Sequence, residues 1–155
     1  MVTTMADAAI GIADIFALVA RLRGEGGCPW DQKQTPETMT KYLRAECEEL
    51  VEAIASGDPA AVREESGDLL FILAFLIRLY EERGAFDRHE VCAEVHAKMV
   101  RRHPHVFGNA QAGSEEELIR QWEAIKAEER RRKEENGTIT EAALPATSFS
   151  PRSAC

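Results

Sequence analysis

Paired cysteines are missing from this sequence. Its four cysteines are scattered and include no Cys-x-x-Cys pair, and Cys47 and Cys92 fall inside predicted helices as small apolar residues. We therefore expect neither a disulfide framework nor a structural zinc site, and we expect a reduced, cytoplasmic location.

Long hydrophobic runs and a basic leader are missing as well. The longest unbroken apolar run, residues 69–77, is far shorter than the roughly 20 residues that a membrane-spanning helix needs. Residues 1–9 contain no basic region ahead of their apolar positions, whereas a secretory signal would have one. We expect a soluble protein without a membrane partner.

Positive charge is in deficit, because the formal net charge is −8. This charge argues against broad, sequence-independent binding of nucleic acid, so we expect no nucleic-acid partner. A phosphate-bearing ligand would have to be met by a metal ion or by local basic groups. The length of 155 residues suits one domain, which we place at residues 6–133. Residues 134–155 lose the apolar period and are expected to form a flexible tail.

No segment has a convincing strand pattern, and helix signals are dense. A capping residue followed by proline occurs twice, at Thr35-Pro36 and at Asp58-Pro59. Gly24 and Gly84 are expected to end helices. The proline- and glycine-rich segments 24–34 and 103–108 are expected to be loops or turns. The sequence therefore predicts an all-α bundle of about five helices, over about residues 12–23, 36–56, 59–83 and 87–102 and from residue 114 onwards.

The third predicted helix is apolar on every side over residues 69–77. Such a helix has to be enclosed all round, and five modest helices do not easily enclose it alone. We therefore expect a homodimer, in which a second copy completes a four-helix core.

Four carboxylates are placed symmetrically about one glycine. Glu46 and Glu49 lie 11 and 8 residues before Gly57, and Asp68 and Glu65 lie 11 and 8 residues after it. In an antiparallel hairpin with a rise of about 1.5 Å per residue, Glu49 is level with Glu65 and Glu46 is level with Asp68. Four such charges repel unless protons or a divalent cation intervene. An all-oxygen site favours Mg²⁺, with Mn²⁺ as the alternative.

Helical acids more often simply face solvent, so the position of Glu46 matters. It falls within an apolar stripe on its helix, with Glu49 at the edge of that stripe and Glu48 and Glu52 pointing elsewhere. The stripe consists of Met39, Leu43, Leu50 and Ile54. A buried carboxylate requires a partner, and a metal fits better than a salt bridge to Arg44 or Arg63, neither of which matches Glu46 in height and direction. A di-iron site is excluded because no Glu-x-x-His pair occurs.

Several motifs follow one another along the chain: Gly27-Cys28-Pro29-Trp30-Asp31 with Gln34-Thr35, the acidic second helix, Glu65-Ser66-Gly67-Asp68-Leu69-Leu70, Arg101-Arg102-His103-Pro104-His105-Val106-Phe107 and Trp122-Glu123-Ala124-Ile125-Lys126. In these motifs and their order, the chain resembles the MazG family of nucleoside triphosphate pyrophosphohydrolases, over about residues 12–130.

The family pattern is Glu-Glu-x-x-Glu on one helix and Glu-x-x-Asp on the next, and two registers are possible here. Residues 48–52 match the first part literally, whereas residues 45–49 match it with Ala45 in place of the first Glu. We favour the second register because the apolar stripe turns Glu46 and Glu49 inward. The resemblance implies that the missing Glu helps to hold a second metal or the attacking water, so turnover would be weakened.

The resemblance implies Mg²⁺-dependent hydrolysis of a nucleoside triphosphate, ordinary or damaged, to the monophosphate and pyrophosphate, as nucleotide-pool housekeeping. Glu46, Glu49, Glu65 and Asp68 would hold the metal, and Glu46 or Glu49 would act as general base. Lys98, Arg102 and Lys126 are similar to family positions that contact phosphate.

Two tryptophans are further candidates for substrate contact. Trp122 could stack on a base, although its helical spacing with Leu118 and Ile125 is more typical of a core residue. Trp30 lies in a predicted loop, where a large aromatic side chain often marks a contact site. The alternative to an enzyme is a nucleotide-binding or helical interaction module with little or no turnover.

Overall fold

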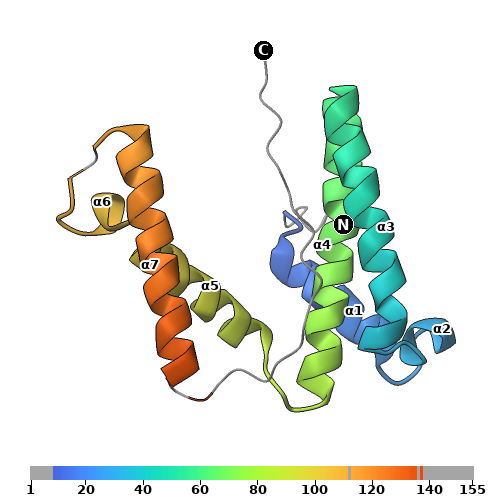
Figure 1. The fold of residues 1–155 in the computed structure, drawn as a ribbon. Coiled ribbons are helices and arrows are strands. Elements are labelled where there is room, and N and C mark those ends of the chain that lie inside the picture. Colours follow the sequence, from blue (N-terminus) through green and yellow to red (C-terminus); the bar gives the residue numbers. More distant parts are fainter. Residues whose placement is uncertain (1–8, 112, 136, 138–155) are drawn as a thin grey trace, which may run out of the picture. The chain divides into compact units, whose positions relative to one another are not determined.

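The computed structural model describes residues 9–111, 113–135 and 137, and the described part is all α-helical (Figure 1). Seven helices occur in it: α1 (Ile12–Arg23), α2 (Pro29–Gln32), α3 (Pro36–Ser56), α4 (Pro59–Glu82), α5 (Arg88–Arg102), α6 (Pro104–Phe107) and α7 (Glu115–Glu135). The all-α prediction is confirmed. No helix among the described residues is long and apolar enough to cross a membrane.

The prediction of about five helices was too low because two short helices lie in segments expected to be loops. Both α2 and α6 are four residues long and begin with proline. Proline at the first helical position has a preset φ and loses no hydrogen bond, so it favours a single helical turn. A single turn is too short to produce a hydrophobic period, and the sequence pattern therefore missed both.

The chain divides into two compact units, one ending at Val95 and the other beginning at His96. The first unit contains α1 to α4 and the first half of α5. Helices α3 and α4 lie side by side as a hairpin (Figure 1), and α1 packs against α4. The second unit contains the end of α5, with α6 and α7. Helix α7 continues to Glu135, so it includes the first two residues of the predicted tail, and residues 138–155 lie outside the described part.

The hairpin begins and turns where its capping residues predict. The Thr35 hydroxyl accepts a hydrogen bond from the Thr38 amide at 3.3 Å. The Asp58 carboxylate accepts one from the Ala60 amide at 2.9 Å. Between the helices, Gly57 has φ +71°, a left-handed conformation that glycine adopts at little cost. These local features set where α3 stops and α4 starts, and so which residues of the two helices lie level.

The core of the first unit lies between α1, α3 and α4. Val19, Met39 and Phe75 are its largest fully buried side chains. The predicted apolar stripe of α3 enters this core only in part: Met39 is buried, Leu43 and Leu50 are half-buried, and Ile54 is 61% exposed. On α4, Leu73 is 45% exposed. Several apolar side chains of the hairpin are therefore not covered by the described residues of the unit.

Arg23, at the end of α1, ties the loop that carries α2 to helix α4. Its guanidinium forms an ion pair with Glu82 at 2.7 Å and donates hydrogen bonds to the carbonyl oxygens of Asp31 and Gln34. The same group lies 5.3 Å from the centroid of the Phe75 ring. An arginine with these partners fixes a glycine-rich segment against the helical core, and with it the position of α2.

Candidate metal centre

Three glutamates converge between α3 and α4. Glu46 and Glu49 of α3 and Glu65 of α4 each offer one carboxylate oxygen, and these three oxygens lie within 4.8 Å of one another. Among the described residues, no other cluster of His, Cys, Asp or Glu is this compact. The spacing about Gly57 predicted that these acids would meet across the hairpin, and the structure brings three of the four together.

The cluster suits a hard divalent cation. Oε2 of Glu46 and Oε2 of Glu65 are buried and have no hydrogen-bond partner among the described residues. Opposite ligands of an octahedral Mg²⁺ are about 4.2 Å apart, since each bond is about 2.1 Å. Carboxylate oxygens are also the ligand type that Mg²⁺ prefers. The donor set therefore fits Mg²⁺, and oxygens that are up to 4.8 Å apart would have to move closer together to share one ion.

Burial and mutual repulsion raise the pKa values of two carboxyl groups in the cluster. Burial raises the pKa of Glu46, and the charges of Glu49 and Asp68 raise it further. Burial likewise raises the pKa of Glu65, with added repulsion from Glu49 and Asp68. Both carboxyl groups thus hold their protons more strongly than an isolated glutamate does. A cation between the two helices would remove this repulsion.

Asp68, the fourth predicted ligand, lies outside the compact group of three. Its side chain is exposed, yet its charge is close enough to raise the pKa of both Glu46 and Glu65. The mirror spacing placed Asp68 level with Glu46 but said nothing about the direction of its side chain. Asp68 therefore remains a predicted ligand that borders the cluster.

The geometry bears on two alternatives: an arginine as the partner of Glu46, and the literal match of the family pattern at residues 48–52. Neither Arg44 nor Arg63 forms an ion pair with Glu46 within the described part of the chain. Glu48 and Glu52, the acids of the literal register, are exposed and lie outside the cluster. The arrangement favours the register that includes Glu46 and Glu49.

Trp30 belongs to the first unit and is 50% exposed on α2. Its ring meets that of Tyr42 edge to face, with centroids 5.6 Å apart, and Lys41 Nζ lies 4.7 Å from the centroid of Tyr42. The sequence reasoning missed Tyr42. Its spacing could have revealed it, because Tyr42 lies four residues before Glu46 and thus on the same face of α3.

The remaining candidates, Lys98, Arg102, Trp122 and Lys126, belong to the second unit. Trp122 is 37% exposed, so it is not the core residue that its spacing favoured. Two cations lie near its ring: Arg102 at 5.8 Å and Lys126 at 4.4 Å from the centroid. Lys126 also pairs with Glu123 at 3.0 Å, and Lys98 is half-buried on α5.

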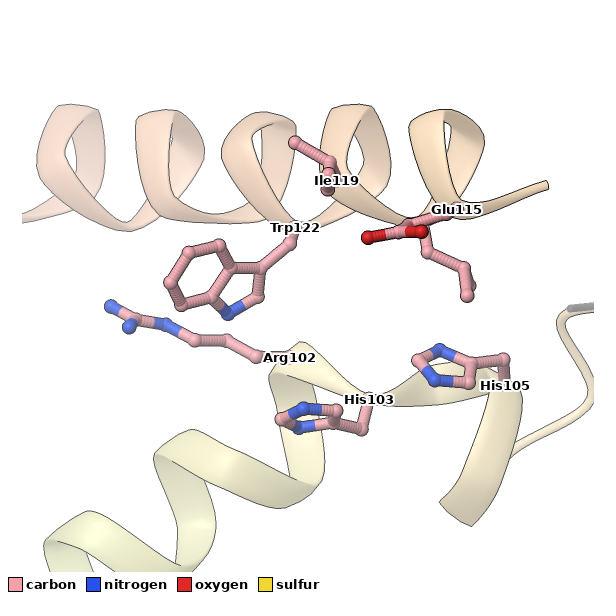
Figure 2. Close-up of a pocket in the computed structure, with 7 residues that line it drawn as sticks. Arg102, His103, His105, Glu115, Ile119 and Trp122 are labelled. Atoms are coloured by element: carbon pink, nitrogen blue, oxygen red, sulfur yellow. The ribbon is translucent and has the colours of Figure 1, made fainter. Parts of the chain in front are cut away.

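A cavity of about 250 Å³ lies next to Trp122 within the second unit. Figure 2 shows Trp122 and Ile119 of α7 on one side of it and Arg102, His103 and His105 on the other. Nδ1 of His103 is 2.6 Å from the Met99 carbonyl oxygen. Nδ1 of His105 is buried and has no partner among the described residues. The cavity therefore combines an aromatic wall with a guanidinium and imidazole groups.

Residues 34–107 match the family described as MazG nucleotide pyrophosphohydrolase domain. The nucleoside triphosphate pyrophosphohydrolase of Escherichia coli (strain K12) is 40% identical over 135 residues, which are 85% of this chain and 51% of that protein. The nucleoside triphosphate pyrophosphohydrolase/pyrophosphatase MazG of Thermotoga maritima is 40% identical over 129 residues, 83% of this chain and 49% of that protein. This chain thus spans about half the length of these relatives.

A solved structure is similar as well. The crystal structure of a mazG-related protein from Thermotoga maritima superposes with a TM-score of 0.63 at 27% identity. The match covers 74% of this chain and 98% of that one.

Proposed function

Because residues 34–107 form a MazG nucleotide pyrophosphohydrolase domain, we propose that this chain hydrolyses a nucleoside triphosphate to the monophosphate and pyrophosphate. The observation that carries the proposal is the cluster of Glu46, Glu49 and Glu65, with its two buried and unpartnered oxygens. Relatives named as nucleoside triphosphate pyrophosphohydrolases, at 40% identity, support it. A nucleotide-pool housekeeping role is part of the same proposal.

Glu46, Glu49, Glu65 and Asp68 are the residues that would hold Mg²⁺, or Mn²⁺ in its place. A bound Mg²⁺ supplies neutralisation of phosphate oxygens and acidification of a water molecule. Of the two candidate general bases, Glu46 is the more buried, and its Oε2 has no hydrogen-bond partner among the described residues. Glu49 is exposed and lies one helical turn away. We assign proton acceptance from the attacking water to this pair, with Glu46 as the first choice.

Cations and aromatic rings are needed for the rest of the substrate, since the acidic cluster supplies only negative charge. We propose that Lys98, Arg102 and Lys126 contact the phosphates. Trp30 offers a half-exposed ring on α2, and Trp122 borders the cavity of the second unit. These two rings are the proposed contacts for the base.

We also propose that the chain forms a homodimer and that its domain extends over residues 6–133. The support for a dimer is that large apolar side chains of the hairpin are exposed: Val51 is 65%, Ile54 61% and Leu73 45% exposed. A helical hairpin gains stability when such side chains are buried. Replacing Leu73 by Asp should yield a monomer in light scattering, and a wild-type chain that is already monomeric would contradict the dimer.

The decisive experiment measures pyrophosphate release from mixed nucleoside triphosphates with Mg²⁺. Release should disappear in Glu49→Gln and Glu65→Gln and persist in Glu52→Gln, whose parent side chain is exposed on another face of α3. If the wild-type protein binds nucleotide but releases no pyrophosphate, the chain is a nucleotide-binding module and not an enzyme. If Glu49→Gln and Glu65→Gln both keep the activity, these glutamates do not take part in the reaction.

A further inference from the structure

One carboxylate in the second unit holds two adjacent arginines. Oε1 of Glu129 accepts a hydrogen bond from Nε of Arg101 at 2.8 Å and forms an ion pair with Nη2 of the same guanidinium at 2.6 Å. Oε2 of Glu129 accepts hydrogen bonds from Arg102, at 3.1 Å from Nε and 2.7 Å from Nη2. Each oxygen thus contacts one guanidinium, Arg102 donates two N–H groups to its oxygen, and the carboxylate joins α7 to the end of α5. Charge-assisted, paired hydrogen bonds of this kind fix direction as well as distance.

The contact is mostly removed from solvent. The side chains of Glu129 and Arg102 are 15% and 17% exposed, whereas that of Arg101 is 51% exposed. Burial acts to raise the pKa of Glu129, but the hydrogen bonds and charges of Arg102 and Arg101 outweigh it and lower the pKa. Glu129 is therefore ionised at neutral pH. One negative charge against two positive charges leaves the group with a net positive charge.

Arg102 is the member of the group that meets the cavity. It lines the cavity together with Trp122, and its guanidinium lies 5.8 Å from the indole centroid (Figure 2). In the described part of the chain, Glu129 is its one hydrogen-bond and ion-pair partner. The orientation of Arg102 beside Trp122 thus depends on Glu129.

We propose that Glu129 is a positioning residue, which holds Arg102 beside Trp122 in the geometry that binds the phosphates of the substrate. The proposal rests on the proposed function, because that function assigns phosphate contact to Arg102. Without the carboxylate, Arg102 would be free to rotate and would repel Arg101, so binding phosphate would require ordering a long side chain again.

A competing effect has the opposite sign. Removing a negative charge near a phosphate site strengthens the attraction for anions. If Glu129 only neutralised the arginines, its removal would tighten phosphate binding. If Glu129 orients Arg102, its removal weakens binding. The direction of the change therefore separates the two roles.

The chain offers a matched control one residue earlier. Glu128 also accepts hydrogen bonds from two arginines, Arg131 and Arg132, but both belong to α7. These arginines lower the pKa of Glu128 to about 2. Glu128→Gln removes the same charge from the same helix and leaves the contact with α5 intact.

The first measurement is calorimetric binding of inorganic tripolyphosphate with Mg²⁺. Glu129→Gln should weaken binding about tenfold, the loss expected when a side chain of this kind has to be ordered again. Glu128→Gln should match wild type, and Glu129→Asp should recover part of the loss. In steady-state assays, Glu129→Gln should raise KM more than it lowers kcat.

The second measurement reports on the geometry and does not need activity. The sequence has two tryptophans, so in a Trp30→Phe background the emission comes from Trp122 alone. Glu129→Gln should change this emission by releasing Arg102, and Glu128→Gln should not. Unchanged emission, or unchanged or tighter tripolyphosphate binding, would overturn the positioning role. Wild-type protein that hydrolyses no nucleotide would refute the proposed function, while the emission and binding results would still decide the role of Glu129.

Discussion

Glu46 and Glu65 face each other across the α3–α4 hairpin, and each has one carboxylate oxygen, Oε2, that is buried without a hydrogen-bond partner among the described residues. A native structure seldom leaves such atoms unsatisfied, because a lost partner costs about 1–3 kcal/mol. Two such oxygens in one cluster favour a bound cation as the missing partner. The first two predictions test this relationship.

The contribution of Glu46 and Glu65 to the stability of the metal-free protein should fall as the pH rises. The pKa values of Glu46 and Glu65 are raised, so their contribution is fully present below the ordinary pKa of glutamate and is lost as the pH passes through the raised pKa. In the presence of a chelator, Glu46→Gln should melt at a higher temperature than wild type at about pH 7 and at a similar temperature at about pH 4. Glu52→Gln serves as control. An equal effect at both pH values would contradict the raised pKa.

Mg²⁺ should restore the stability that the cluster costs. Ligand at 100 times its Kd stabilises a native protein by about 2.7 kcal/mol, which corresponds to an increase in Tm of about 5 to 11 °C for a chain of this size. Glu65→Gln should lose most of this increase. NaCl at matched ionic strength is the control for screening, and an equal increase with NaCl would show that no specific site exists.

Replacing either of two glycines by alanine should change the free energy of unfolding, in opposite directions at the two positions. Gly57 has φ +71°, so Gly57→Ala places a Cβ in the left-handed region and should lower the free energy of unfolding by about 1 kcal/mol. Gly67 lies inside α4, and a Cβ added there meets no atom within 4 Å. Gly67→Ala should raise the free energy of unfolding by about 0.5–1 kcal/mol. Urea denaturation of both variants measures the two changes, and a Gly57→Ala variant as stable as wild type would contradict the assigned turn.

Trp30 should affect binding of the nucleoside more than binding of the phosphates. Stacking of a base on an aromatic ring is worth about 1–3 kcal/mol, so Trp30→Ala should raise KM for nucleoside triphosphates about fivefold to 100-fold. Its half-exposed ring makes a large loss of stability unexpected. Trp30→Phe should retain part of the affinity. If Trp30→Ala weakens inorganic tripolyphosphate binding equally, the ring does not contact the base.

Ala45 occupies the place where the family pattern has a glutamate, one helical turn before Glu49. Ala45→Glu should raise turnover, because the added carboxylate would complete the acidic set for metal or water. Pyrophosphate release measures the change, with Ala45→Gln as the uncharged control. Unchanged or lower turnover would show that the register or the role given to this position is wrong.

Local signals in the sequence account for much of the first unit. The capping residues and prolines at 35–36 and 58–59 start α3 and α4, and Gly57 separates them. Since helical rise is constant, equal spacing about that turn was sufficient to predict that Glu49 and Glu65 meet. These rules act within a few residues and need no knowledge of distant contacts.

Other features depended on side-chain direction and on contacts between distant segments. Spacing made Asp68 and Glu65 equivalent, yet Glu65 joins the compact cluster and Asp68 borders it. The stripe on α3 was expected to be covered, yet Ile54 is 61% exposed. The contact of Glu129 with Arg101 and Arg102 links residues 27 and 28 positions apart, and a helical period contains no information at that range.

The chain alone therefore settled where α3 and α4 start and turn and which carboxylates lie level across the hairpin, because caps, prolines, glycine and helical rise act locally. The folded molecule was needed to show which of those carboxylates lose their hydrogen-bond partners, which apolar side chains stay uncovered and which acid pairs with Arg102. These properties depend on packing between segments that are distant in the chain, and packing is a property of the whole fold.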